Sequence, residues 1–398
     1  MHRRRLAIAL LAVAAACGGD DGEGSGAARS TISVEPVAAE YTGDDDGFYD
    51  VPDPLPDGAH GDLVRWQRLD SDTEDGAWRV MYLSESVSGD PIAVTGVVAA
   101  PAGTPPADRP VVTWAHGTAG IADRCAPSKD PEGQVLGLAG PFLERGWVFA
   151  ATDYEGLGTP GIPTSTVALA EAHAALDSIR AVAALPNVGP LGDVVLAGHS
   201  QGGRAALFAA EIAPVYAPEL TLVGAVALAP GVELPMLVDH VATSPLTGVA
   251  LMGAIGLRAG YPALDLSTVF TPSAIADIPR VETECVDETF ARYRPLATSA
   301  VISRRPSSLP DLKSLLEENS PGQHPPSVPV FIGHGDADQQ VPIAVSHQLA
   351  TKYCALDVNV SRHTYAGQDH DAIVDAAASD AMAFITNRFD DNPASGTC

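Results

Sequence analysis

The sequence predicts an α/β protein with a mostly parallel sheet flanked by helices, and three observations support this prediction. Apolar runs of a length suited to buried strands alternate with helical stretches along most of the chain, as in a parallel sheet with helices on both faces. One of these runs passes through a glycine-containing turn directly into a helical pattern. Hydrophobic residues make up 46% of the chain and charged residues 18%, which indicates a globular protein.

The expected elements begin near residue 78. Two strands are expected within 78–100, because Ser-Gly-Asp-Pro at 88–91 has the composition of a turn. Buried strands are expected at 111–115, 147–152, 193–197, 222–229 and 328–333, and an alternating edge strand at 357–365. Helices are expected at 132–145, 165–185, 202–213, 341–353 and 371–388.

Residues 1–16 have the pattern of a signal peptide. Three arginines precede an apolar run of 11 residues, which is too short to span a bilayer. Cys17 follows small residues and precedes a Gly/Asp-rich stretch, as at a bacterial lipoprotein cleavage site, although Ala14 stands where leucine is usual. We therefore expect a lipid on Cys17, a flexible tether over 17–45, and an exported bacterial protein at the cell surface or in the periplasm. Ordinary cleavage and free secretion are the alternative.

The charge balance narrows the range of partners. The chain has 50 acidic and 23 basic residues, a net charge of −27. Residues 1–16 hold three arginines and no acidic residue. Without this segment, the chain has 20 basic and 50 acidic residues and a net charge of about −30. This balance argues against nucleic acid and anionic lipid surfaces as partners. The sequence has no H-E-x-x-H and no Walker loop, so metal and nucleotide sites have no support, and we expect no metal.

Four cysteines remain after Cys17: Cys125, Cys285, Cys354 and Cys398. An even number of cysteines in an exported protein indicates two disulfides. Three pairings are possible, and composition does not choose among them.

The glycine-containing turn carries the strongest chemical signal. The apolar run before it leads into Gly198-His-Ser-Gln-Gly202, and a helical pattern follows. A G-x-S-x-G turn between strand and helix is the nucleophile elbow of an α/β-hydrolase. Glycines at both ends remove side chains that would clash in the turn, and the following helix points N–H groups at a developing oxyanion. The sequence therefore predicts Ser200 as a nucleophile held in a strained conformation.

A serine nucleophile needs a base that is oriented by an acid, and in this fold they follow in the order acid, then histidine. The strand at 328–333 continues as His334-Gly-Asp-Ala-Asp338. Many α/β-hydrolases carry H-G-x-x-D here, which favours Asp338 as the acid and leaves Asp336 to shape the turn. Of the two histidines near the last strand, His363 lies within it and His370 in the loop before the final helix. We predict His370 as the base.

Acyl transfer also needs two N–H groups to hold the oxyanion. The residue after the nucleophile, Gln201, supplies one. The second is expected from the His-Gly-Thr segment after the strand at 111–115, with the N–H of Thr118 preferred and that of Gly117 as the close alternative. The following segment 153–158 is expected to buttress this loop.

The βα alternation stops between 231 and 323. This stretch carries apolar helical patterns at 246–257 and 309–316 but no clear βα repeat. At this point in a hydrolase sheet, an insertion would cover the active site as a cap. We therefore expect an α/β-hydrolase core at 46–230 and 324–398, and a helical cap (lid) insertion at 231–323.

Four segments resemble the secretory lipase family of the α/β-hydrolase superfamily. They are Trp114–Gly120, Asp123–Ser128, Ala151–Gly161 and Gly198–Gly203. The resemblance covers about 45–398 and implies hydrolysis of carboxylic esters, including acylglycerols, by a Ser-Asp-His triad beneath a helical cap, without a cofactor. It also implies the disulfides Cys125–Cys285 and Cys354–Cys398.

We thus expect an exported serine hydrolase that cleaves neutral esters as a lipase or esterase, through an acyl-enzyme intermediate. Its partner would be a small-molecule or lipid ester, and membrane attachment would depend on the lipid alone. We expect a monomer. A peptidase or amidase of the same fold, and a surface lipoprotein without turnover, are the alternatives.

Overall fold

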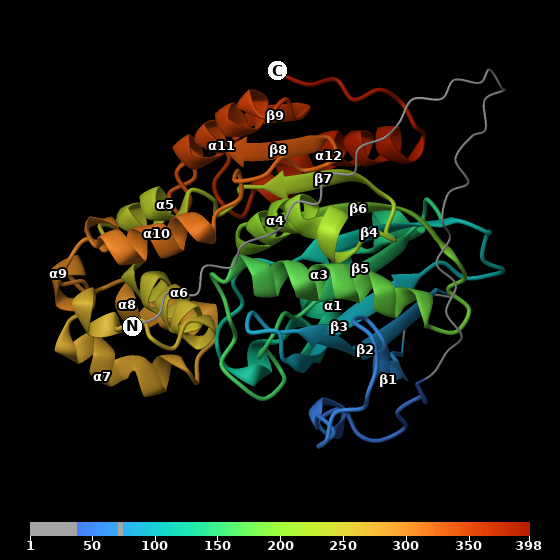
Figure 1. Ribbon diagram of the computed structural model, residues 1–398, viewed down its shortest axis with the longest axis horizontal. Coiled ribbons are helices and arrows are strands. Elements are labelled where there is room, and N and C mark those ends of the chain that lie inside the picture. Colours follow the sequence, from blue (N-terminus) through green and yellow to red (C-terminus); the bar gives the residue numbers. More distant parts are fainter. Residues whose placement is uncertain (1–37, 71–74) are drawn as a thin grey trace, which may run out of the picture.

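The computed structural model describes residues 38–70 and 75–398. The predicted signal peptide, Cys17 and most of the predicted tether lie outside the described residues. Within them, nine strands form one sheet in the order β1-β2-β3-β5-β4-β6-β7-β8-β9 (Figure 1). The strands are β1 (Leu63–Arg68), β2 (Gly76–Glu85), β3 (Pro91–Ala100), β4 (Arg109–Ala115), β5 (Val148–Thr152), β6 (Leu191–His199), β7 (Leu222–Leu228), β8 (Val330–Gly335) and β9 (Val360–Tyr365).

The six strands β4 to β9 pair in parallel with one another. The pairs β1–β2, β2–β3 and β3–β5 are antiparallel. The prediction of a mostly parallel sheet flanked by helices is confirmed. Strand β1 was not predicted from the sequence. This edge strand has few fully buried positions, so it carries no apolar run of the kind that marks the central strands.

Successive residues of a strand face opposite sides of the sheet, and the two sides carry different helices. On β4, Val111 packs into the cluster with helices α3 (Ala168–Ala183), α4 (Gln201–Tyr216) and α11 (Ile343–Ala355). Its neighbour Val112 packs on the other side with α12 (Ile373–Phe389). These four helices match the helices predicted from the sequence to within a few residues at their ends.

The prediction of one continuous helix at 132–145 is wrong. The structure has two single-turn helices there, α1 (Pro131–Gln134) and α2 (Gly140–Leu143), joined by a short 3₁₀ turn. Three glycines and a second proline, Pro141, interrupt the segment, and both residue types are poor in helix interiors.

Between β7 and β8 the chain forms a separate helical layer beside the sheet (Figure 1). Its helices are α5 (Leu234–Val241), α6 (Thr247–Gly260), α7 (Pro272–Val281), α8 (Val286–Tyr293), α9 (Thr298–Val301) and α10 (Pro310–Glu318). This layer has a hydrophobic cluster of its own around Leu251, Ile255 and Phe270. We refer to residues 231–323 as the cap, keeping the predicted boundaries.

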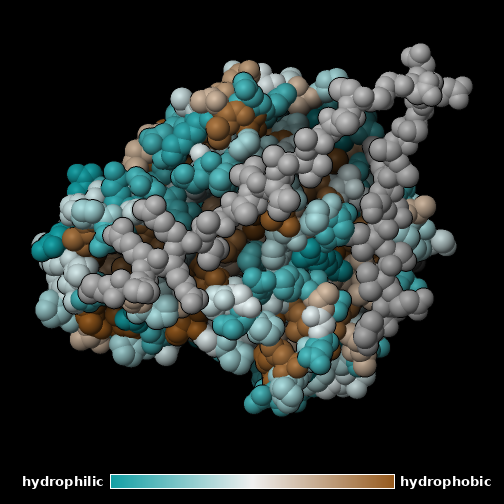
Figure 2. Space-filling view, viewed as in Figure 1, coloured by the Kyte–Doolittle hydropathy of each residue, from teal (hydrophilic) through white to brown (hydrophobic). Residues whose placement is uncertain are grey.

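Two features fix the ends of the described chain. Residues 38–45, which the sequence reading gave to the tether, contact the core: Tyr41 N–H donates to the carbonyl of Trp66 at 2.7 Å, and Asp45 pairs with Arg79 at 3.2 Å. At the other end, a disulfide joins Cys354 to Cys398. No helix among the described residues is long and apolar enough to cross a membrane. In the view of Figure 2, hydrophilic residues cover most of the surface, and hydrophobic side chains gather along one edge of the cap.

Candidate active site

The turn between β6 and α4 holds Ser200 in a backbone conformation that few residues adopt, with φ 57° and ψ −117°. Close packing explains the two glycines. A Cβ on Gly202 would lie 1.8 Å from the carbonyl oxygen of Ala115, and one on Gly198 would lie 2.3 Å from the carbonyl oxygen of Gly202. The positive φ lies in the left-handed region and is strained for a serine. The turn has the geometry expected of a nucleophile elbow.

Three loops bring the predicted nucleophile, base and acid together. His370 Nε2 lies 2.8 Å from Ser200 Oγ, and His370 Nδ1 lies 2.7 Å from Asp338 Oδ2. A carboxylate only accepts, so Nδ1 carries the proton and Nε2 accepts from the serine hydroxyl. The rejected residues lie elsewhere. Asp336 accepts from the N–H of Gly367 at 2.6 Å. His363 lies on β9, where its ring contacts Ser361 at 3.0 Å and Asp380 of the last helix at 3.8 Å.

Asp338 is held ionised. Its Oδ1 accepts from the N–H groups of Gln340 and Val341, both at 2.8 Å. Burial alone would raise the pKa of Asp338. Hydrogen bonds from His334 and His370, with the Coulombic attraction of His370, outweigh burial and hold the pKa well below its usual range. Asp338 therefore stays ionised and can accept the hydrogen bond from His370 Nδ1.

His334 is a partner that the sequence reading did not assign. Its ring is fully buried, and Nε2 lies 3.2 Å from Asp338 Oδ2 and 3.0 Å from the carbonyl oxygen of Val341. Both neighbours accept, so Nε2 is protonated and donates to them. The signal was present in the H-G-x-x-D spacing, which puts this histidine four residues before the acid.

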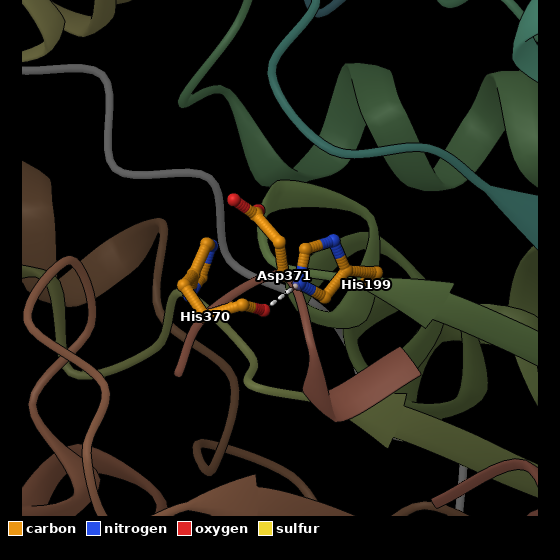
Figure 3. Close-up of side chains that lie close together, drawn as sticks. All are labelled: His199, His370 and Asp371. Atoms are coloured by element: carbon orange, nitrogen blue, oxygen red, sulfur yellow. Dashed lines mark hydrogen bonds between the residues drawn. The ribbon is translucent and has the colours of Figure 1, made fainter. Parts of the chain in front are cut away.

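His199 contacts His370 from the other side. Its Nε2 donates to the carbonyl oxygen of His370 at 2.8 Å, as the dashed line in Figure 3 shows. Burial, and the proximity of His370, lower the pKa of His199 to about 4. Among the described residues, His199, His370 and Asp371 offer ligand atoms within 4.8 Å of one another. Hydrogen bonds to Ser200 and to the main chain already account for the Nε2 atoms of both rings.

The two predicted oxyanion residues lie against the nucleophile and against each other. Gln201 begins α4 directly after Ser200. The Thr118 hydroxyl donates to the Gln201 side-chain oxygen at 3.0 Å. A Cβ on Gly117 would lie 3.6 Å from the Cβ of Ser200, so this loop runs along the serine. As expected, the following segment supports the loop: the Tyr154 hydroxyl donates to the carbonyl of His116 at 2.9 Å.

The cap is tied to the loop that carries Thr118. A disulfide joins Cys125 of the core to Cys285 of the cap, and Cys354 pairs with Cys398. These are the two pairs that the family resemblance implies. Beside the first disulfide, the N–H of Val286 donates to the carbonyl of Ala119 at 2.9 Å. The edge of the cap is thus fixed to the loop next to the nucleophile.

A cavity of about 330 Å³ lies between the core and the cap. We call its core side, with Ser200, His370, Thr118 and Gln201, the floor. We call its cap side the wall; its apolar side chains include Leu246, Val249, Leu257, Phe270, Phe290 and Leu312. An apolar cavity of this size with a few convergent polar groups is typical of a small-molecule binding site.

Known proteins resemble the chain over most of its length. The profile of the secretory lipase family matches residues 135–397. Lipase 6 of Candida albicans is 26% identical over 396 residues, which span 89% of this chain and 83% of that protein. Secreted triacylglycerol lipase LIP4 of Malassezia globosa is 26% identical over 336 residues, 78% of this chain and 72% of that protein.

The fold has a solved counterpart. The crystal structure of Candida antarctica lipase A superposes with a TM-score of 0.77 at 21% identity, over 89% of this chain and 88% of that one. This likeness shows the α/β-hydrolase fold, and the family profile covers about two thirds of the chain. The chain belongs to the secretory lipase family, and it is an exported enzyme that hydrolyses carboxylic esters.

Proposed function

We propose that Ser200, His370 and Asp338 form the catalytic triad of this esterase, and that the N–H groups of Gln201 and Thr118 hold the oxyanion. One observation carries the proposal. The three side chains form an unbroken hydrogen-bonded line, at 2.7 and 2.8 Å, that ends on a strained serine at the cavity floor. A serine in reach of a base that is itself oriented by a carboxylate has the geometry of nucleophilic acyl transfer.

In the first half of the reaction, Ser200 Oγ bonds to the ester carbonyl carbon while its proton passes to His370 Nε2. The carbonyl oxygen takes up the negative charge between the two N–H groups. Asp338, hydrogen-bonded to Nδ1, stabilises the imidazolium. The carbon–oxygen bond to the alcohol then breaks, and His370 returns the proton to the leaving alkoxide.

In the second half, His370 takes a proton from water as the hydroxide oxygen bonds to the acyl carbon. The bond to Ser200 Oγ breaks, the serine regains its proton from His370, and the carboxylic acid leaves. Protons and charges balance over the cycle, and no step needs a metal or a redox group.

The wall of the cavity supports a neutral, apolar acyl chain as substrate. Apolar side chains line it on the cap side, and an acyl chain buried there leaves water. The named relative from Malassezia globosa is a triacylglycerol lipase. We therefore propose acylglycerol-type esters as the substrate class. We also propose that residues 231–323 act as a lid over the cavity, because the polypeptide of the wall comes from this segment.

The finer localisation is also a proposal. The small residues before Cys17 and the Gly/Asp-rich stretch after it support a lipid-anchored, bacterial protein. Replacing Cys17 with serine should release the enzyme from membranes into the medium. Recovery of the unchanged protein in the medium, with a mass that includes no lipid, would favour free secretion instead.

The proposal is tested by replacing Ser200 with alanine. Hydrolysis of p-nitrophenyl butyrate should fall to the uncatalysed rate, and a fluorophosphonate probe should no longer label the protein. Ser361→Ala, on β9, serves as the control and should keep both properties. Full activity of the Ser200 variant would refute the triad. A panel with aminoacyl anilides detects an amidase, and tributyrin below and above its solubility limit separates esterase from lipase.

A further inference from the structure

The side chain of Gln201 lies between two groups that take no part in the proposed reaction, the hydroxyl of Thr118 and the carboxylate of Glu171. Its side-chain oxygen accepts from the Thr118 hydroxyl at 3.0 Å. On the other side, a side-chain hydrogen bond from Gln201 favours the ionised form of Glu171. An amide that accepts with its oxygen donates with its nitrogen. Gln201 therefore links a residue of the loop after β4 to a carboxylate on α3.

Glu171 is buried, with 1% of its surface exposed, and all its partners are donors. Arg204 Nη2 contacts both carboxylate oxygens at 2.6 and 2.8 Å, Arg204 Nε donates at 3.2 Å, and the N–H of Thr166 donates at 3.1 Å. Burial raises the pKa of Glu171, and Arg204, Thr166 and Gln201 oppose that rise. A bidentate contact with a buried arginine closely fixes the position of the carboxylate.

Arg204 follows Ser200 by one helical turn on α4, and Glu171 is on the neighbouring helix α3. The two oxyanion residues come from different elements: Gln201 from α4, and Thr118 from the loop after β4. Their N–H groups must keep a fixed separation, because an oxyanion donor acts only within about 2.7–3.1 Å of the oxygen. The chain Arg204–Glu171–Gln201–Thr118 connects the two elements.

We propose that Glu171 is a positioning residue of the oxyanion hole: it fixes the Gln201 amide, and this amide fixes Thr118 through its hydroxyl. The inference rests on the proposed function, in which these two N–H groups hold the oxyanion. Glu171 touches neither substrate nor nucleophile in this scheme. Its effect passes through the Gln201 side chain.

Matched variants of Thr118 give the first test. Thr118→Val keeps the shape and removes the hydroxyl, and Thr118→Ser keeps the hydroxyl. We expect kcat for p-nitrophenyl butyrate to fall on the order of 10-fold to 100-fold in the valine variant, with KM within about twofold, and to fall clearly less in the serine variant, which keeps the hydroxyl. Equal kcat in the valine variant and the wild type, or an equal loss in both variants, would overturn the proposal.

A tetrahedral analogue separates positioning from general damage. A boronic acid bonds to the serine oxygen and places a boron-bound oxygen in the oxyanion hole. Its affinity should weaken in Thr118→Val by about the same factor as kcat/KM, whereas a purely structural change would alter the two by unrelated factors. Full activity of Ser200→Ala would refute the proposed function itself. That outcome is distinct from the results with the Thr118 variants, which test only the positioning of the oxyanion hole.

The role of Glu171 is tested by a double-mutant cycle. Glu171→Gln alone leaves Arg204 without its charge partner, so the paired change Glu171→Leu with Arg204→Met is made as well, since apolar replacement of a buried pair preserves folding better. Each should lower kcat by about the same factor as Thr118→Val, on the order of 10-fold to 100-fold. Adding Thr118→Val should then cause little further loss, because the connection is already broken. Losses that multiply would show that Glu171 acts independently and would contradict the proposal.

Discussion

The floor and the wall of the cavity are built in different ways. On the floor, Ser200 bonds to His370 at 2.8 Å, and His370 bonds to Asp338 behind it at 2.7 Å. On the wall, side chains such as Val249 and Phe290 contribute shape and apolar surface. Hydrogen bonds in a buried site depend on direction and on single atoms, whereas apolar contact depends mainly on volume. One lost atom on the floor should therefore cost far more than one on the wall.

After the loss of the nucleophile itself, the largest effect is expected from Asp338→Asn. An amide in this place cannot stabilise the imidazolium and favours the other tautomer of His370, so kcat should fall on the order of 10⁴-fold. Steady-state kinetics with p-nitrophenyl butyrate measure this loss.

Asp336→Asn is the matched control. Asp336 lies two residues earlier and bonds to the N–H of Gly367, so its replacement should change kcat by less than about tenfold. If the two variants lost activity equally, the assignment of the acid to Asp338 would be wrong.

The next largest effect is expected from the disulfide between the core and the cap. Cys125 and Cys285 are separated by 160 residues, and Cys354 and Cys398 by 44. Loop-closure entropy predicts losses of unfolding free energy of about 5 and about 4 kcal/mol when each pair is replaced by serines. Urea unfolding at 25 °C measures both.

The two disulfide variants should differ more in activity than in stability. The first disulfide lies beside the loop that carries Thr118, and the second ties the C-terminus to α11. Only the Cys125/Cys285 variant should lose kcat under conditions where both variants are folded. Equal activity in the two variants would mean that the cap edge does not hold the floor in place.

The same contrast explains what the sequence could predict. The elbow requires glycines within one turn, and the acid and base follow in a fixed chain order, so Ser200, Asp338 and His370 could be proposed from short motifs. His199 could not, because its partner is the main chain of His370, 171 residues away. Glu171 was missed because it is one polar residue within a helix, and only the neighbouring helix supplies Arg204.

The cap was predicted as a unit but not in detail. The apolar patterns at 246–257 and 309–316 correspond to α6 and α10, and the other four helices were not anticipated. Three of those are eight residues long or shorter, and α7 contains an internal proline, Pro279. Helices this short are stabilised by tertiary packing rather than by their own sequence, so no window of residues predicts them.

His199, on the floor, should make the free energy of unfolding depend on pH. Burial and the nearby His370 lower its pKa to about 4, whereas the unfolded chain binds the proton with a pKa of about 6.5. The unfolded state therefore holds more protons between these values, and stability falls as the pH drops from about 6.5 to about 4, by up to about 3 kcal/mol.

The measurement is urea unfolding from pH 7 to pH 4 for the wild type and His199→Asn. Asparagine does not titrate, so the difference in unfolding free energy between the two proteins should shrink as the pH falls. A difference that stays constant across this range would mean that His199 does not bind the proton differently in the folded state.

The smallest effect is expected on the wall. Phe290→Ala removes a large apolar side chain from the cavity lining, and the space it leaves should accept a longer acyl chain. A pocket distinguishes substrates by about 1–3 kcal/mol per methylene at most, so the ratio of kcat/KM for p-nitrophenyl dodecanoate to that for the butyrate should rise on the order of tenfold. Absolute kcat for the butyrate should change little, because the hydrogen bonds of the floor remain. An equal loss of activity on both esters would instead show that the Phe290 side chain supports the floor. At α8, the wall would then not act through its volume alone.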